Sequence, residues 1–270
     1  MEISFVKLSP TQNVTVLAIS PVPRAEQPAA AAKLLAYDGV GGEQAGFLEK
    51  PAHSAARARL QMMGGEFCGN AAMSLGAYLA RQDGLADGAS EEYLLEVSGA
   101  EGLVPCRVER RGNAFAGTVR MPLPTGIGRA RLACDAGEIE LDRVDLPGIT
   151  HLVAPMDGLS REEIQRRIRQ WNEEIRAEAL GVLRWDEAAG RMEPIVYVPE
   201  TDSAVWESGC GSGTAALGAY LARRAGRTFL SAVRQPGGEI VVRAELDGEA
   251  FRELTITGEV RITAEGTAFV

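Results

Sequence analysis

The sequence predicts an α/β (α+β) fold made of two pseudo-symmetric domains, each with a curled sheet around a central helix. The first observation is a repeat: Cys68–Gly84 and Cys210–Gly226 agree at ten of seventeen positions across a displacement of 142 residues, which indicates two homologous halves. The second is that the helix in each copy is apolar on nearly every face, so it must be enclosed. The third is the alternation of apolar and polar residues in the surrounding runs, which is typical of strands.

The repeated segments justify the two central helices. Ala71–Arg81 and Gly213–Arg223 are rich in Ala, Leu and Met, lack Pro, and stop near Gly84 and Gly226, where glycine favours a helix C-terminus. A third helix, charged and amphipathic, is expected at Arg161–Ala179 on an outer face. Strands are expected at the period-two runs Glu2–Leu8, Val14–Ile19, Glu91–Val97, Gly102–Glu109, Ile195–Val198, Glu239–Glu245 and Leu254–Ile262.

A segment rich in Pro and Gly marks the boundary between the two halves. Met121–Gly128 reads MPLPTGIG and is the best signal for an interdomain linker. The expected domains are an N-terminal one of residues 1–122 plus 258–270, which carries Cys68, and a C-terminal one of residues 123–257, which carries Cys210. A pseudo-twofold axis between the domains follows from the duplication.

The charge and composition exclude several classes of partner. The 28 basic and 37 acidic residues give a net charge of −9, which repels a phosphate backbone and an anionic membrane surface. No window approaches the roughly 20 apolar residues of a membrane span. The N-terminus MEISFVKLSP resembles no signal peptide, so we expect the cytoplasm, where the four cysteines stay reduced. We expect a small-molecule substrate and no nucleic acid or membrane partner.

The two repeated cysteines are candidate catalytic groups. Each precedes a helix, so backbone N–H groups and the positive end of the helix dipole point at its sulfur. Such placement lowers a thiol pKa from about 8.5 towards roughly 3.5–7.5, which predicts a usable base or nucleophile. The alternative is that Cys68 and Cys210 are small core residues. Cys106 and Cys134 lack this context, and we expect them to be structural.

Two opposed thiols suit one class of reaction. A pseudo-twofold axis would bring both sulfurs to one cleft from opposite sides. Inversion of a carbon acid removes a proton from one face and delivers another to the opposite face, which requires one thiolate and one thiol. The helix N-termini supply N–H donors for the substrate carboxylate as it takes up charge. This chemistry requires no cofactor.

Six motifs are similar, in order, to those of the diaminopimelate epimerase-like racemases. They span nearly the whole chain: GVGGEQ (Gly39–Gln44), GGEFCGN (Gly64–Asn70), GITH (Gly148–His151), VWES (Val205–Ser208), CGSG (Cys210–Gly213) and LTITG (Leu254–Gly258). The resemblance implies two similar domains and a cleft that holds both thiols and no pyridoxal phosphate. It also implies catalytic roles for Cys68 and Cys210. The substrate contacts that it implies are Asn13, Gln44, Gln61, Gly69, Asn70, Glu207, Gly211 and Ser212.

The departures from the diaminopimelate pattern bear on the substrate. Ser208 stands where the family has the arginine that binds the distal carboxylate, and Ile149 stands where it has an asparagine. Without that arginine a distal carboxylate is poorly held, so we expect an amino acid with a neutral or cationic far end. The acids available to meet it are Glu43, Glu66, Glu193 and Asp202. The pattern resembles the histidine racemases that make D-histidine for staphylopine-type metallophores.

Other readings remain open at this point. Diaminopimelate or another amino acid is the alternative substrate, and a catalytically silent amino-acid-binding module is the alternative from another class. Asn70 argues against the proline racemases, whose first motif reads Cys-Gly-His. His53 and His151 have no companions for a metal site, and no nucleotide-binding fingerprint or Schiff-base lysine motif is present. We therefore expect no metal and no cofactor; a homodimer is a further expectation.

Overall fold

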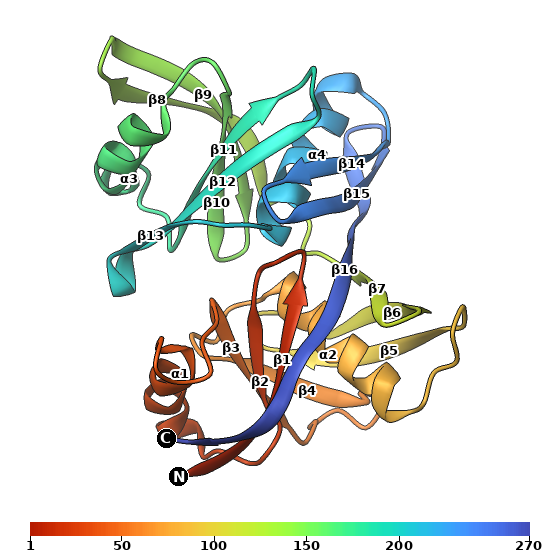
Figure 1. Cartoon of the computed structure of the whole chain (residues 1–270). Helices are drawn as coiled ribbons and strands as arrows, with labels where there is room; N and C mark the ends of the chain where they lie inside the picture. Colours follow the sequence, from red (N-terminus) through yellow and green to blue (C-terminus); the bar gives the residue numbers. More distant parts are fainter. The chain divides into compact units, whose positions relative to one another are not determined.

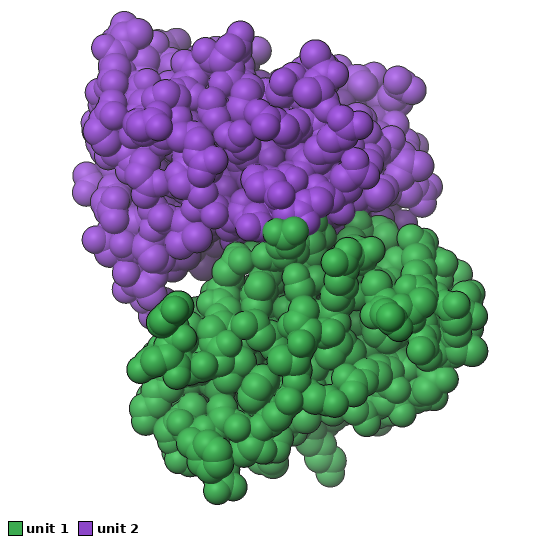
Figure 2. Space-filling model, viewed as in Figure 1, with its two compact units in different colours: residues 1–120, 257–270 green, residues 121–256 purple.

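The computed structural model describes residues 1–270. The chain forms two compact units, coloured separately in Figure 2: unit 1 is residues 1–120 with 257–270, and unit 2 is residues 121–256. Residues 121–125 connect them once, and the long strand β16 (Ala250–Phe269) returns the chain from unit 2 to unit 1. None of the helices is both long and apolar enough to cross a membrane.

Unit 1 is a ring of strands. Its strands follow the order β1-β2-β3-β4-β5-β6-β7-β16, and β16 also pairs with β1, so the ring closes. Two of the pairings, β2 with β3 and β4 with β5, are parallel. The elements, besides β16, are β1 (Glu2–Pro10), β2 (Thr15–Ala18), the single turn η1 (Arg24–Glu26), α1 (Gln27–Leu35), β3 (Gln44–Glu49), β4 (Ala58–Met62), α2 (Gly69–Gln82), β5 (Ser90–Val97), β6 (Leu103–Arg111) and β7 (Ala114–Arg120).

Helix α2 lies inside this ring (Figure 1). It contacts β1, β2, β4, β5, β6 and β7, and eleven of its fourteen residues are buried. The helix ends as the sequence predicts: Gly84 takes a positive φ of 68°, and the N–H of Leu85 bonds to the carbonyl of Ala80. Burial raises the pKa of Cys106 to about 12. That thiol packs against α2 near Gly76, as expected of a structural cysteine.

Unit 2 repeats the plan with an open sheet. Its strands follow the order β15-β14-β12-β11-β10-β9-β8, with β13 added beside β12. Helix α4 contacts β9, β10, β11, β14 and β15, and ten of its fifteen residues are buried. The elements are β8 (Gly126–Cys134), β9 (Gly137–Leu146), β10 (Ile149–Pro155), α3 (Arg161–Ile175), β11 (Leu180–Asp186), β12 (Arg191–Val198), the single turn η2 (Pro199–Thr201), β13 (Ser203–Trp206), α4 (Gly211–Ala225), β14 (Phe229–Gln235) and β15 (Gly238–Asp247).

The predicted fold class is confirmed, because each unit is a mixed sheet around one buried helix. Each of the seven predicted strands corresponds to an observed one. The third helix is shorter than predicted, since Arg176 leaves the helix with a left-handed φ of 59°. Trp171, in this charged helix, is fully buried, and its Nε1 donates to the carbonyl of Ala133 at 2.8 Å.

Candidate active site

Cys68 and Cys210 occupy equivalent positions in the two units. Each is the N-cap of the central helix of its unit, with extended backbone angles that stop the helix at the next residue. The sulfur of Cys68 accepts from the N–H of Ala71 at 3.4 Å, and the sulfur of Cys210 accepts from the N–H of Gly213 at 3.3 Å. The predicted placement at two helix N-termini is therefore confirmed.

The predicted lowering of the thiol pKa is wrong for Cys210. Burial raises the pKa of this thiol well above its ordinary value, and the Glu207 carboxylate raises it further through its charge and a hydrogen bond. The Ser212 hydroxyl and the N–H of Gly213 act in the opposite direction and are outweighed. The helix dipole is a local effect that the sequence reveals, whereas loss of hydration depends on the whole unit. Cys210 is therefore a thiol at neutral pH in the absence of substrate.

A chain of polar groups leads from Cys210 to His151. The Ser212 hydroxyl lies 3.6 Å from the Cys210 sulfur, and Nε2 of His151 lies 3.1 Å from that hydroxyl. Burial lowers the pKa of His151 to about 3, so the imidazole is neutral at physiological pH. Its Nδ1 has no hydrogen-bond partner, which assigns the proton to Nε2, because an unpaired buried acceptor costs less than an unpaired N–H. Nε2 thus donates to Ser212, leaving the hydroxyl proton free to face the sulfur.

Gly181 makes room for the His151 ring. The two residues are partners in the parallel pair of β10 and β11, and a Cβ at position 181 would lie 2.0 Å from Nδ1. We expect Gly181→Ala to displace the ring, lower the free energy of unfolding by about 1–3 kcal/mol and reduce activity through Ser212. Denaturant unfolding and initial rates measure both effects. Gly128→Ala is the matched control, because a Cβ there meets open space; equal behaviour of the two variants contradicts this role of Gly181.

The backbone of Cys210 is held by a ring of three hydrogen bonds. The Cys210 N–H donates to the side-chain oxygen of Gln235 at 2.7 Å, and the Gln235 amide donates to the Thr214 hydroxyl at 2.8 Å. That hydroxyl donates to the carbonyl of Cys210 at 2.6 Å. All three residues are buried. Because both the N–H and the carbonyl of Cys210 are held, the position of its sulfur is fixed.

On the other unit, Cys68 belongs to a network of amides. Its S–H donates to the side-chain oxygen of Gln44 at 2.9 Å. The Gln44 amide donates to Asn13 at 2.5 Å and to Thr15 at 2.8 Å, and the Asn13 amide donates to Glu43 at 3.2 Å. The structure thus brings the predicted residues Asn13 and Gln44 together with Cys68.

The other predicted contacts divide into two groups. Gly69 and Asn70 lie in the first turn of α2, Gly211 and Ser212 lie in the first turn of α4, and Glu207 lies beside Cys210. Gln61 has no direct hydrogen bond to the cysteine site. On β4, it accepts from Arg59 at 3.2 Å and donates to the carbonyl of Met62 at 3.2 Å, and neither bond reaches Cys68.

Of the four acids expected near the far end of the substrate side chain, two form ion pairs with arginines of unit 2. Glu193 pairs with Arg184 and with Arg191, and Asp202 accepts from Arg169 at 2.6 Å. Their charges are already balanced within unit 2. Glu43, by contrast, joins the network that reaches Cys68; partial burial raises its pKa, and the N–H of Val14 opposes that shift.

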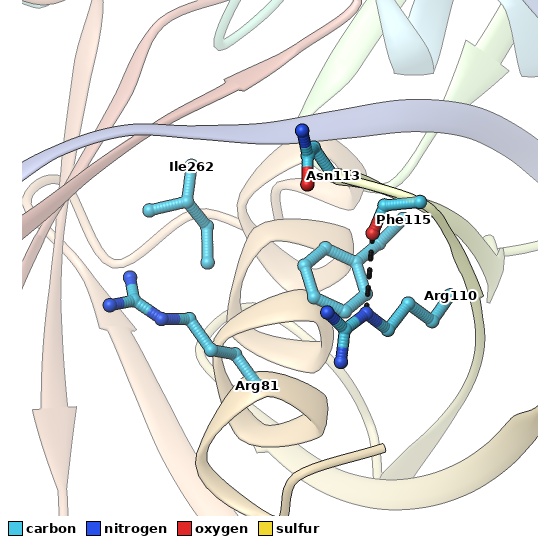
Figure 3. Close-up of a pocket in the computed structure, with 6 residues that line it drawn as sticks. Arg81, Arg110, Asn113, Phe115 and Ile262 are labelled. Carbon is cyan, nitrogen blue, oxygen red and sulfur yellow. Dashed lines mark hydrogen bonds between the residues drawn. The ribbon is translucent and has the colours of Figure 1, made fainter. Parts of the chain in front are cut away.

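A separate hollow of about 250 Å³ lies beside α2 and β16 (Figure 3). Arg81, Arg110, Phe115 and Ile262 line it. Arg81 lies at the end of α2 far from Cys68, about 20 Å along the helix. Both arginines are engaged, Arg81 with Glu265 and Arg110 with the carbonyls of Leu85 and Gly112. This hollow is therefore not part of the cysteine site.

Comparison with known proteins gives the family. A family model described as the histidine racemase CntK N-terminal domain matches residues 2–269. The chain belongs to the histidine racemase family. A histidine racemase of Staphylococcus aureus is 31% identical over 282 residues, which cover 99% of this chain and 98% of that relative. A histidine racemase of Fusobacterium nucleatum is 30% identical over 275 residues, covering 99% of this chain and 97% of the relative.

Solved structures of this family's wider fold agree with the architecture. A hydroxyproline epimerase of Agrobacterium vitis superposes with a TM-score of 0.73 at 17% identity, covering 98% of this chain and 92% of that chain. A PhzF-family phenazine biosynthesis protein of Bacillus anthracis gives a TM-score of 0.70 at 15% identity and covers all of both chains. At these identities the likeness shows the fold of this member of the histidine racemase family.

Four residues that support the cysteine site are not evident from the sequence. Thr15 and Gln235 orient side chains or backbone at the cysteines, Thr214 completes the ring at Cys210, and Gly181 accommodates His151. Thr214 carries the one usable signal, because a hydroxyl in the first turn of a helix can bond back to the N-cap carbonyl. The others act through pairings between distant strands.

Proposed function

We propose that the protein interconverts L- and D-histidine by a two-base mechanism in which Cys68 and Cys210 act on opposite faces of the α-carbon. One observation carries the proposal: two cysteines are matched N-caps of the central helices of two units, in a chain of the histidine racemase family. The contacts around each sulfur support this chemistry, since each thiol has a helix N-terminus and a polar group beside it.

In each turnover one thiolate takes the α-proton. The C–H bond breaks, an S–H bond forms, and the electron pair stays on the α-carbon, where the substrate carboxylate delocalises it. The opposite thiol then gives its proton to the other face and keeps the S–H electron pair as a thiolate. The N–H groups of the first turns of α2 and α4 are the proposed donors to the carboxylate. Glu207 is the proposed partner of the α-ammonium, and pyridoxal phosphate has no part in the scheme.

Glu43 is the proposed partner of the imidazole. Its carboxylate accepts from Asn13 at 3.2 Å and from the N–H of Val14 at 3.4 Å, which leaves acceptor capacity for a ring N–H. It lies on the network that ends at Cys68. Ser208 replaces the arginine that a distal carboxylate needs, which disfavours diaminopimelate.

Further expectations accompany this proposal. Two thiols that act on one carbon are close enough to oxidise, so the enzyme requires a reducing compartment such as the cytoplasm. We propose that D-histidine is its product for metallophore biosynthesis and that the active form is a homodimer. Activity lost in air and recovered with a thiol reductant supports this view of the thiols.

Substrate identity is tested by exchange of the α-hydrogen in heavy water. We expect L-histidine to yield D-histidine with deuterium at the α-carbon, and diaminopimelate and the other common L-amino acids to incorporate deuterium at least about 100-fold more slowly. Mass spectrometry of the separated enantiomers measures both events. Faster exchange of diaminopimelate supports the epimerase alternative, and binding of histidine without any exchange supports the binding-module alternative.

A further inference from the structure

Gln44 is held in one orientation by groups that can only accept a hydrogen bond from it. Glu43 accepts from the Asn13 amide, so the side-chain oxygen of Asn13 is the atom that faces Gln44. The Thr15 hydroxyl donates its own proton to the carbonyl of Asn13 at 3.4 Å, so it too accepts from Gln44. Both N–H groups of the Gln44 amide are thereby used.

The remaining atom of the amide is the one that meets the thiol. The Gln44 carbonyl oxygen lies 2.9 Å from the Cys68 sulfur. A carbonyl oxygen only accepts, so the contact is favourable when the sulfur carries a proton and unfavourable when it is a thiolate. The charge of Glu43 therefore sets the direction of each successive hydrogen bond as far as Cys68.

The backbone that carries Asn13 is itself constrained. Thr11 and Gln12, which join β1 to β2, both have left-handed conformations with φ of 47° and 60°. The N–H of Asn13 closes this turn on the carbonyl of Pro10 at 2.8 Å, and the N–H of Thr11 bonds to the carbonyl of Glu259. Two successive non-glycine residues in this region are strained, and such strain is concentrated at functional sites.

We infer that Gln44 is a positioning residue that holds Cys68 as a thiol, through an orientation set by Asn13 and Thr15. This inference rests on the proposed function for its catalytic meaning, because Cys68 is there an acid and a base. When Cys68 delivers its proton, the S–H bond breaks, the C–H bond forms from the carbanion pair, and sulfur keeps the other pair. The thiolate then faces a carbonyl oxygen, which makes it a stronger base for the reverse step.

The expected chemistry of Gln44 differs from a simple substrate contact. Its two donors are spent on Asn13 and Thr15, so it has no N–H left to give to a substrate carboxylate. Directional rates do not expose its role, because two enantiomers are equally stable and the forward and reverse values of kcat/KM are equal. The titration of Cys68 in the free enzyme does expose it.

The test is the pH dependence of Cys68 alkylation by iodoacetamide in the full chain without substrate, followed by peptide mass spectrometry. The variant Gln44→Met keeps the side-chain length. In it we expect the rate of Cys68 alkylation at about pH 7 to rise about tenfold, and the pH midpoint of alkylation to fall by about one unit. Thr15→Val leaves Gln44 in place but frees its amide to turn an N–H towards sulfur, so the midpoint should fall here too. The neighbouring carboxylates Glu43 and Glu66 are unchanged in both variants.

Gln27→Met is the matched control. Gln27 is also a buried glutamine of unit 1, and its amide bonds to Val22 and Glu49. We expect its Cys68 midpoint to match that of the unaltered protein. An unchanged or raised midpoint in Gln44→Met, or in Thr15→Val should the first variant not fold, overturns the inference. If the alkylation midpoint of Cys68 falls in the variants but the unaltered protein does not racemise histidine, the role of Gln44 stands and the proposed function fails. The two failures are therefore distinguishable.

Discussion

Cys68→Ser and Cys210→Ser each lower kcat/KM for histidine racemisation by at least about 10³-fold. The reason is that inversion needs a proton-transfer group on both faces of the α-carbon, and a serine hydroxyl is far too weak an acid to replace a thiol. Both cysteines are N-caps whose serine variants retain the helix-capping bond. The folded structure should therefore survive the change. Initial rates with each enantiomer measure the loss.

The control for these variants is Cys134→Ser. Cys134 ends β8, is a free thiol and has no bond to the site residues, so its replacement should leave the rate within about twofold. A single variant at Cys68 or Cys210 that keeps full turnover contradicts the two-base scheme. Loss of activity in Cys134→Ser as well would point to general destabilisation.

The second large effect is a rise of activity with pH. Burial and the Glu207 carboxylate raise the pKa of the Cys210 thiol, and a raised pKa means that its thiolate forms only as the pH increases. Since we infer that Gln44 also holds Cys68 as a thiol, the enzyme form with one thiolate should be scarce at neutral pH. We expect kcat/KM to rise by up to about tenfold per unit from about pH 7 and to fall once both thiols ionise.

Glu207→Gln tests the cause of that rise. The variant removes the charge beside Cys210, so the Cys210 thiolate should form at lower pH and the rising limb should shift in the acid direction. Alkylation of Cys210 in the free enzyme separates this shift from any weaker binding of the substrate ammonium. A rate that is flat between about pH 6 and pH 9, or an alkylation midpoint that does not move in the variant, refutes the assigned cause.

The parts of the fold that the sequence predicts are those governed by local pattern. Helices α2 and α4 follow from their composition and from Gly84 and Gly226, which end them in left-handed conformations. Strands such as β10 and β11 were not predicted, because they are short, buried and parallel, with pairing set by a helix between them. The charged sequence of α3 does not reveal that Trp171 is buried, because its burial depends on β8 and β11 packing against that helix.

The site divides in the same way. The N-cap positions of both cysteines follow from the sequence beside them. The hydrogen bond from Cys68 to Gln44 spans 24 residues, and that from Cys210 to Gln235 spans 25 residues, so neither is visible as a local motif. The pKa of Cys210 illustrates the limit most clearly, because the dipole that lowers it is local and the burial that raises it is not.

Transfer of label during a single turnover is the most direct check on the scheme. Unlabelled L-histidine is incubated in heavy water, stopped at low conversion, and both enantiomers are separated and weighed by mass spectrometry. If separate thiols serve the two faces, the newly formed D-histidine carries deuterium at the α-carbon while the remaining L-histidine stays largely unlabelled. D-histidine that retains the original hydrogen would mean that one group carries the proton across, and the account would fail.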